Sequence, residues 1–355
     1  MINTKEDTVS NISSYFGVKS DKLNRHYKYK VSGFQTWNQK SHASRYLIFP
    51  ENIGLYLSID EVSLSKGELY TFITNKDGKG KQGTLVACIE GTKAEDIQKV
   101  LELITIDKRL IVKEITLDMA KNMESGVKAT FPNASLVTDR FHVVKLALDA
   151  LQHIRVKFRW AEMDLENIAL SNIKKLKKEQ IEALEKHKND PLESKKITDE
   201  YQNKIASLKP KEFENGDSAK QLLARSRYIL VKKETQWTKN QQHRAEILFE
   251  HYPDLKNAYN QVMSFRNIYE QQDKETAKIM FEKWIEKINK EEMKEFYTVA
   301  NTIQNHLDNI LNFFTYRHTN ANAESFNAKI KLFRANLRGV VDTEFFLFRL
   351  HKLFA

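Results

Sequence analysis

The sequence predicts an α/β protein in which a mixed β-sheet carries helices on both faces. A large all-helical insertion is expected to interrupt the sheet, and a short helical N-terminal region to precede it. Residues 57–145 predict the sheet, because apolar, β-prone runs there alternate with amphipathic helix patterns. Residues 146–315 predict the insertion, because their apolar residues recur at spacings of three and four. Only five prolines and eleven glycines interrupt 355 residues, which favours long regular elements.

The first 56 residues are expected to form two helices, at Val9–Tyr15 and Ser20–Val31. Ser20 suits the N-cap of the second helix, because its hydroxyl can accept a hydrogen bond from the first turn. A glycine in the connecting turn and basic residues on the second helix are features of a helix-turn-helix. The same features fit a small packing or linker element, so both interpretations stay open.

Residues 57–145 are expected to contain seven elements in the order β-β-β-α-β-α-β. They are strands at Leu57–Leu64, Glu68–Thr74 and Thr84–Glu90, a helix at Lys93–Ile104, a strand at Val112–Leu117, a helix at Met119–Thr130 and a strand at Ser135–Thr138. Thr92 is the expected N-cap of the first helix, with Glu95 completing a capping box. An antiparallel meander joined by right-handed crossovers to parallel strands is the arrangement of ribonuclease-H-like folds.

Residues 316–355 are expected to complete this core after the insertion at 146–315. A helix over Ala321–Asn336 and an apolar segment, Phe345–Leu350, would pack back on the sheet. The helix has an apolar stripe that should be buried, made of Phe326, Ile330, Phe333 and Leu337. A second stripe is polar and is made of Glu324, Asn327, Lys331, Arg334 and Arg338.

The composition favours a polyanionic partner and an intracellular location. The net charge is +10, and phosphates are bound largely through Lys and Arg, although a merely basic enzyme has the same surplus. Cys88 is the only cysteine, which excludes an intramolecular disulfide and a zinc ribbon and favours a reducing cytoplasm. The polar start is followed by no signal-type apolar stretch, and no window reaches the length of a membrane span.

Three acidic residues, Asp60, Asp118 and Glu324, suggest a site for two Mg²⁺ ions that act on a phosphodiester. Mg²⁺ takes hard oxygen ligands, so carboxylates suit it, and Mn²⁺ is expected to substitute. The strand bearing Asp60 should neighbour the strand that ends at Asp118, about 4.8 Å away. The strand that ends at Asp139 should lie one place further out, roughly 10 Å from the first. Asp118 is therefore the preferred second ligand.

Glu324 must be brought to these aspartates by the tertiary fold. Its polar stripe places an amide and cations behind the carboxylate, which suits a metal ligand beside a DNA backbone. We therefore predict DNA contacts from Lys331, Arg334 and Arg338. Each acid also has an ordinary explanation, since Asp60 can end a strand at a turn, Asp118 can be a helix N-cap and Glu324 can lie on a surface helix.

Two further groups of residues are candidates for supporting roles. Asp139 and His142 lie three apart at a strand-to-helix junction, where they can position the site or simply cap the helix around a buried imidazole. A basic group in the helical segment is a hypothetical DNA-contact patch, made of Arg225, Arg227, Lys232 and Lys233.

At these motifs the sequence resembles bacterial insertion-sequence transposases of the DDE type, in particular the ISL-three group. The matching motifs are Ile59-Asp60-Glu61, Asp118-Met119, Asp139-Arg140-Phe141-His142-Val143 and the run from Asn320 to Lys331 that contains Asn320-x-x-x-Glu324-x-x-Asn327. The resemblance covers roughly residues 55–355. It implies a ribonuclease-H-like catalytic core with a helical insertion before the final Glu, and Mg²⁺-dependent excision and strand transfer at terminal inverted repeats.

By position, Asp60, Asp118 and Glu324 match the acidic triad of that group, and Asp139 and His142 match its Asp-x-x-His motif. Asn327 is expected to support the site. The resemblance also implies a homo-oligomer bound to double-stranded DNA. Many relatives carry an N-terminal cysteine zinc module that is missing here, so a separate N-terminal partner protein from an upstream reading frame is an expectation too.

Two other functions stay open from the sequence. One is a structure-selective, metal-dependent nuclease without strand transfer. The other is a non-catalytic DNA-binding product of a decayed element. The domains expected on this interpretation are an N-terminal region (1–56), the first part of the catalytic core (57–145), the helical insertion (146–315) and the C-terminal part of the core (316–355).

Overall fold

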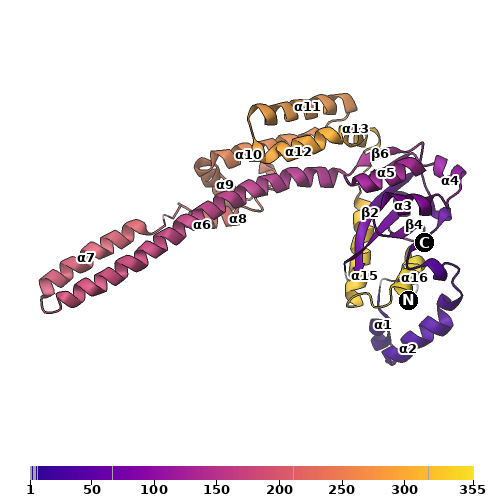
Figure 1. Cartoon of the computed structure of the whole chain (residues 1–355), viewed down its shortest axis with the longest axis horizontal. Coiled ribbons are helices and arrows are strands. Elements are labelled where there is room, and N and C mark those ends of the chain that lie inside the picture. The colour runs from indigo at the N-terminus through magenta and orange to yellow at the C-terminus, as the bar shows by residue number, and fades with distance from the viewer. Residues whose placement is uncertain (1, 3–4, 6, 66, 211, 319) are drawn as a thin grey trace. The chain divides into compact units, whose positions relative to one another are not determined.

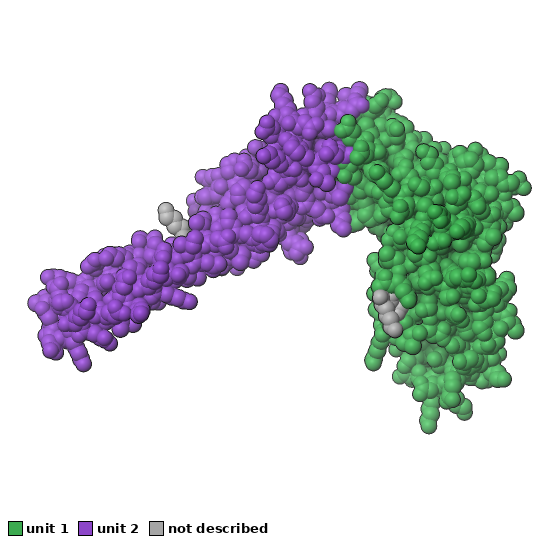
Figure 2. Space-filling model, viewed as in Figure 1, with its two compact units in different colours: residues 1–143, 272–278, 302–355 green, residues 144–271, 279–301 purple. Residues whose placement is uncertain are grey.

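The chain forms two compact units, which are coloured separately in Figure 2. The structure, a computed structural model, describes residues 2, 5, 7–65, 67–210, 212–318 and 320–355. Unit 1 comprises Met1–Val143, Gln272–Lys278 and Thr302–Ala355, and unit 2 comprises Val144–Gln271 and Ile279–Asn301. The chain passes from one unit to the other within the helices α6, α11 and α12 (Arg140–Lys186, Lys274–Lys290 and Lys294–Asn305), and also between Gln271 and Gln272.

Unit 1 is built on a six-stranded sheet with the order β1-β4-β3-β2-β5-β6. The strands are β1 (Tyr46–Ile48), β2 (Tyr56–Ser65), β3 (Glu68–Asn75), β4 (Leu85–Glu90), β5 (Glu114–Leu117) and β6 (Ser135–Thr138). The β1–β4, β4–β3 and β3–β2 pairs are antiparallel, whereas β5 is parallel to both β2 and β6. The predicted α/β class and mixed sheet are confirmed, and so is the prediction that Asp60's strand neighbours the strand ending at Asp118.

The edge strand β1 was not anticipated from the sequence. Its three residues are too few to show an alternating pattern, and they pair with β4 from Tyr46↔Ile89 to Ile48↔Ala87. The side-chain amide of Gln39 binds both main-chain polar groups of Ile48, accepting from its N at 2.8 Å and donating to its O at 2.9 Å. The residues before the meander therefore contribute to the sheet as well as to helices.

One face of the sheet is covered by α3 (Ala94–Leu101) and α5 (Lys121–Thr130), with α4 (Ile106–Leu110) between them in the chain (Figure 1). Ile59, Ile115 and Ile97 belong to the buried cluster on this side. The two helices pack closely at Gly126, because an added Cβ would lie 3.1 Å from the carbonyl oxygen of Ala94. The predicted capping box was wrong: the N-cap of α3 is Lys93, and it makes no side-chain cap hydrogen bond.

The opposite face is covered by α15 (Ala321–Asn336) and α16 (Thr343–Phe354). Phe326, Ile330 and Phe333 of α15 are fully buried against apolar side chains of β2, β3 and β4 such as Val62 and Phe72. The predicted span of α15 is confirmed, but Leu337 is 38% exposed and does not join the buried stripe as predicted, since the helix has ended by then. On β2, Val62 and Leu64 are apolar and Asp60 on the same face is not, so this face has a polar part beside the apolar one.

The N-terminal helices belong to the same unit. They are α1 (Val9–Tyr15) and α2 (Ser20–His26), followed by the short helices η1 (Tyr27–Val31), η2 (Phe34–Thr36), η3 (Lys40–His42) and, after β1, η4 (Pro50–Asn52). Ser20 was predicted as the N-cap of the second helix, which is wrong because the cap position is Lys19. Phe34 and Trp37 pack against Phe348 of α16, so the region contributes to the hydrophobic core.

His351 of α16 makes the stability of unit 1 depend on pH. Its ring lies 4.8 Å from that of Phe49 and 5.6 Å from that of Trp37, and its buried Nδ1 has no hydrogen-bond partner within the described residues. Burial lowers the pKa of His351, the charge of Lys352 lowers it further, and Glu51 opposes them. Its contribution to stability is therefore fully present above pH 6.5, the ordinary value, and is lost as the pH falls through the lower folded-state pKa.

We expect the substitution His351→Phe to weaken the loss of unit 1 stability between pH 7.5 and pH 5, because it removes a group that must be neutral when folded. Hydrogen exchange of the α16 amides, followed at several pH values, measures this directly. A variant whose stability falls as steeply as that of the wild type would contradict the assignment.

Unit 2 is helical wherever its regular elements are described. Besides its parts of α6, α11 and α12 it contains α7 (Pro191–Leu208), α8 (Ala219–Arg225), η6 (Glu234–Gln236), α9 (Lys239–His251) and α10 (Pro253–Ile268). Its core is aromatic, with Phe265 in ring contact with Phe281 and Trp284. By contrast, α7 runs beside the second half of α6 without burying a single residue (Figure 1).

The remaining helices of unit 1 are η5 (Lys76–Gly78), α13 (Leu307–Leu311) and α14 (Phe313–Tyr316). Asn312, between α13 and α14, donates to the main-chain oxygen of Leu136 on the edge strand β6 at 2.9 Å. None of the described helices combines the length and apolarity that crossing a membrane requires.

Candidate functional site

Three aspartates stand at the same level on three neighbouring parallel strands. β2 and β5 are paired up to Ser58↔Thr116, so two more residues along each strand bring Asp60 and Asp118 to equivalent positions. β5 and β6 are paired up to Leu117↔Thr138, and the next residues are Asp118 and Asp139. The main-chain N of Asp139 still donates to the O of Leu117 at 2.8 Å, so the pairing reaches this level. The strand order places Asp118 between Asp60 and Asp139, as the sequence predicted.

Asp60 lies within β2, so the explanation that it merely ends a strand is excluded. Its carboxylate accepts two hydrogen bonds, from the main-chain N of Glu61 at 2.8 Å and from Nδ2 of Asn327 at 2.6 Å. Burial raises the pKa of Asp60, and the carboxylates of Asp118 and Asp139 add to the rise, although the bond from Glu61 and the charge of His142 oppose it.

Asn327 joins the helix that bears Glu324 to this strand. It is buried, one turn after Glu324 on α15, and its amide reaches Asp60 across 267 residues of sequence. Further bonds hold the same helix to the sheet side: Asn322 donates to the O of Lys76 at 3.0 Å, Lys329 to the O of Gly80 at 2.6 Å, and Arg334 to the O of Ser63. Glu324 thereby comes to the aspartates while its own side chain stays exposed.

The charges of the aspartates on the sheet affect the pKa of Glu324. Burial raises the pKa of Glu324, the charge of Asp139 raises it next, and Asp60 adds a smaller rise that His142 opposes. Asp118 is half-buried after β5 and accepts from the main-chain N of Ala120 at 2.8 Å. Because α5 begins at Lys121 with Ala120 as its N-cap, Asp118 holds the loop before the helix and is not the cap itself.

Asp139 and His142 form a pair at the start of α6. Nδ1 of His142 lies 3.1 Å from Oδ2 of Asp139, which is ion-pair distance, but neither atom has a well-aligned hydrogen bond within the described residues. Contact with Asp139 raises the pKa of His142, and the charges of Asp60 and Asp118 act in the same direction. Asp139, only 2% exposed, also accepts from the main-chain N of Phe141 at 3.2 Å.

These residues are called the acidic cluster below: Asp60, Asp118, Asp139, Glu324 and their histidine, His142. Glu61 was not predicted as a site residue, but it interacts with the acidic cluster. Burial raises the pKa of Glu61, and the charges of Asp118 and then Asp60 raise it further. Mutually destabilised carboxylates are neutralised by a hard cation, and their oxygens are the donors that Mg²⁺ and Mn²⁺ take. As the side chains stand, no three acidic or histidine groups among the described residues converge on one metal position.

A buried ion pair that the sequence did not predict involves β5, the strand that leads to Asp118. Nζ of Lys76 lies 2.6 Å from Oε1 of Glu114 on β5, and it also donates to the hydroxyl of Thr116. Lys76 and Glu114 are 6% and 1% exposed. Nδ1 of His318 lies 3.2 Å from the other oxygen of Glu114. The alternation of Glu114 and Thr116 with apolar residues was the one sequence signal for this polar face.

The cations predicted to contact DNA have different surroundings. On α15, Lys331 is exposed, Arg334 is bound to Ser63, and Arg338 lies just past the helix end with a φ of 56°. In unit 2, Arg225 is paired with the buried Asp217, which also binds Arg244, and Lys233 is paired with Glu270.

The remaining two predicted cations of unit 2 are Arg227, whose guanidinium lies 5.6 Å from the ring of the exposed Tyr228, and the half-buried Lys232.

A comparison with protein families finds a match over most of the chain. The model of the ISL-three group of DDE-type families, described as "Transposase", matches residues 57–350. The matched range begins within β2 and ends within α16, so it contains every member of the acidic cluster. A search of curated proteins finds no match.

Proposed function

Since the chain belongs to the ISL-three family of DDE-type transposases, we propose that it cuts DNA at the ends of a mobile element and joins those ends to target DNA. Transposases of this type process DNA and generally use divalent metal ions. The finer assignment is that Asp60, Asp118 and Glu324 hold two Mg²⁺ ions, for which Mn²⁺ substitutes. In the same proposal residues 57–145 and 316–355 form the catalytic core and residues 146–315 interrupt it.

The hydrogen bond between Asn327 and Asp60 carries this proposal. It joins two parts of the chain that are 267 residues apart in the sequence, and it brings the exposed carboxylate of Glu324 toward a row of aspartates. The raised pKa of Glu324, caused by burial and then by Asp139 and Asp60, supports the same proximity. A rearrangement of the exposed or half-buried carboxylates would let them share a cation, because Asp60 and Asp118 belong to neighbouring strands and Asn327 bonds the helix of Glu324 to Asp60.

The acidic residues would hold the metal ions, which neutralise charge on the phosphodiester and activate the attacking oxygen. Asn327 would keep Asp60 oriented, as outer-shell hydrogen bonds do at metal sites. His142 would hold Asp139 and add a positive charge near the scissile phosphate when protonated. Lys331 and Arg338 would follow the DNA backbone along α15.

The proposed partners are double-stranded DNA at the terminal inverted repeats, target DNA, and further copies of the chain. A separate N-terminal partner protein from an upstream reading frame would add to the recognition of the element ends. Unit 2 would contribute Arg227 and Lys232, together with Arg225 and Lys233 once DNA competes for their carboxylate partners.

A strand-transfer assay tests the proposal. The full chain is incubated with precut, radiolabelled element ends, a supercoiled target plasmid and Mg²⁺, and joined products are measured. We expect joining to depend on the metal ion and on a free 3′-hydroxyl. Cleavage of uncut ends without any joining would instead indicate a nuclease, and binding without either reaction would indicate a non-catalytic DNA-binding protein.

A further inference from the structure

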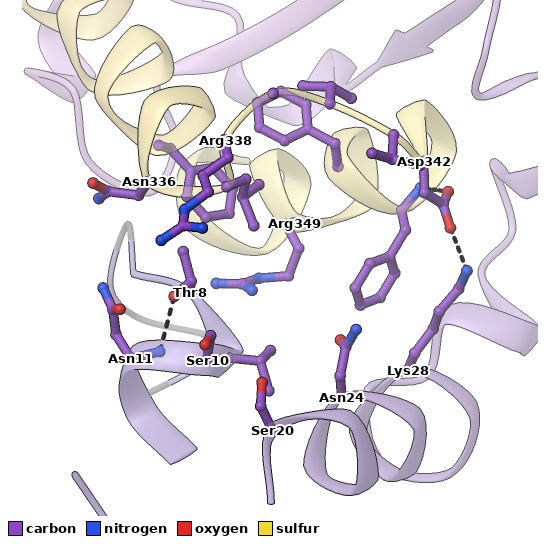
Figure 3. A pocket seen from close by; sticks show the side chains of 18 residues that line it. Thr8, Ser10, Asn11, Ser20, Asn24, Lys28, Asn336, Arg338, Asp342 and Arg349 are labelled. Carbon is purple, nitrogen blue, oxygen red and sulfur yellow. Dashed lines mark hydrogen bonds and ion pairs between the residues drawn. The ribbon is translucent and has the colours of Figure 1, made fainter. Parts of the chain in front are cut away.

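A cavity of 550 Å³ lies in unit 1 between the N-terminal helices and the C-terminal end of α15 with the start of α16 (Figure 3). It is separate from the acidic cluster, and none of the members of that cluster line it. Its size is within the range of ligand sites in proteins, about 300–1,000 Å³. Its walls combine aromatic side chains, such as Phe345, with amides and cations, such as Asn24 and Arg338.

The lining is positively charged. The described residues that line it include three cations, Lys28, Arg338 and Arg349, and one carboxylate, Asp342. That carboxylate is already bound to Lys28 on the far side of the cavity from the two arginines (Figure 3). Among the described residues, none forms an ion pair with the guanidinium of Arg338 or of Arg349.

Arg349 is the less usual of the two, because its side chain is 3% exposed and buried cations in proteins are normally paired. Its guanidinium donates weakly to the main-chain oxygens of Lys5 and Asp7, at 3.4 and 3.2 Å, and its Nε has no partner among the described residues. Burial lowers the pKa of Arg349, although Tyr27 and the carboxylate of Asp7 oppose the shift. In Figure 3 this side chain extends into the cavity, on the same side as Arg338.

An anion with several acceptor oxygens would satisfy this arrangement. A guanidinium has five donors in a planar fork that matches phosphate oxygens, and two such groups facing one space favour a phosphate over a single carboxylate. Ser10 and Asn24 add uncharged donors to the same wall. The exposed Arg338 and the fully exposed Val341 place the opening of the cavity at the surface.

The cavity stands at the far end of the helix that bears Glu324. Glu324 lies roughly 18 Å from Asn336 at the end of this helix, because an α-helix rises about 1.5 Å per residue, and Arg338 follows two residues later, which makes the span about 20 Å. That length corresponds to about six base pairs of duplex, at about 3.4 Å each. Lys331, exposed on the same stripe, lies between the two ends.

We propose that this cavity is a second contact point for DNA, which takes one backbone phosphate about six base pairs from the phosphodiester at the acidic cluster. The inference depends on the proposed function, because it takes the ligand to be the DNA held at that cluster. Its role would be to fix the distance between the cleaved bond and a phosphate in the flanking duplex. The phosphate would displace the weak bonds of Arg349 to the main chain.

Two variants test the cavity without touching the acidic cluster. Arg338→Asn removes one charge at a left-handed position that asparagine tolerates, so the fold should be unaffected. Arg349→Lys keeps the buried charge but removes the planar fork. Lys99→Gln, an exposed charge loss on the opposite face of the sheet, is the matched control. Circular dichroism checks that all three fold.

Binding of the full chain to a duplex that contains an element end is measured by fluorescence anisotropy in Ca²⁺, across a range of salt concentrations. We expect each cavity variant to weaken binding about tenfold, and Arg338→Asn to reduce the salt slope by about one. Lys99→Gln should leave both quantities unchanged. Equal affinities and slopes in wild type and both cavity variants would overturn the inference.

A second measurement locates the phosphate and separates DNA from a free anion. Single phosphates of the duplex are replaced by uncharged methylphosphonates, one position at a time. Wild-type binding should weaken at a position about six base pairs from the cleavage site, and Arg338→Asn should be insensitive there.

If instead inorganic phosphate binds the cavity and no position of the duplex shows this coupling, the ligand is a free phosphate and the DNA assignment is wrong. Because the readout is binding, it is independent of whether Asp60, Asp118 and Glu324 perform the chemistry.

Discussion

The substitution Asp60→Asn is expected to reduce metal-dependent cleavage of an element end by roughly a thousandfold or more. The change keeps the shape of the side chain and its hydrogen bond from Glu61, but it removes the negative charge that Asp60 would offer to a cation. Asp118→Asn and Glu324→Gln should have effects of the same size, since each would complete the coordination of one metal ion. Cleavage of a labelled duplex in Mg²⁺ and in Mn²⁺ measures all three.

DNA binding should persist in these variants, because a carboxylate beside a phosphate does not contribute attraction to DNA in the absence of a metal ion. Asp107→Asn, an exposed residue of α4 outside the cluster, is the control for the same chemical change. Retained cleavage in one of the three variants would remove that residue from the ligand set. Asp139→Asn then decides an open point, because Glu324 responds more strongly to Asp139 than to Asp60. A loss as large as that of Asp118→Asn would make Asp139 a ligand as well.

The second large effect concerns stability. The substitution Lys76→Met is expected to destabilise unit 1 by about 3–5 kcal/mol, because it leaves Glu114 buried beside His318 without its ammonium partner. A buried carboxylate that loses its counter-ion must either stay charged in a poor environment or take up a proton. Hydrogen exchange of the β5 amides reports the free energy of opening in this unit alone.

The double variant Lys76→Met/Glu114→Leu separates the pair from the space that it fills. Replacing both charges by apolar groups of similar size removes the desolvation cost together with the attraction, so most of the lost stability should return. A double variant that is as unstable as Lys76→Met would show that the surrounding polar groups, including the hydroxyl of Thr116, require the charges. The comparison of the two variants therefore measures how much of the stability of unit 1 depends on this ion pair.

The spacing of apolar residues predicted the sheet and α15 well, because apolar side chains recur wherever one face of a strand or helix is buried. The apolar alternation of β2 and β5 identified neighbouring strands with Asp60 and Asp118 at one level, and the 3.6-residue period of Ala321–Asn336 gave that helix its observed bounds. The gathering of Glu324 with the aspartates is different. It depends on one amide of Asn327, and periodicity only shows that this residue lies on the same stripe.

Contacts between distant polar residues could not be predicted from the sequence. In the sequence, Lys76 looks like an ordinary basic residue before a glycine-bearing loop. It is buried because it is bonded to Glu114, which lies 38 residues later in the chain. The strand β1 is likewise defined by its partner β4 and not by its own three residues. Helix ends were uncertain for a related reason: Thr92 and Ser20 suit caps chemically, but the chain begins each helix elsewhere.

The two hydrogen bonds between the side chain of Gln39 and the main chain of Ile48 affect how the protein behaves in concentrated solution. A sheet that ends in an uncovered strand offers a row of main-chain donors and acceptors on which a strand from a neighbouring molecule can add. Gln39 occupies the donor and the acceptor of Ile48, so it blocks recruitment of a foreign chain at that position of the β1 margin. A single amide side chain thus helps to keep separate copies of the protein from fusing their sheets.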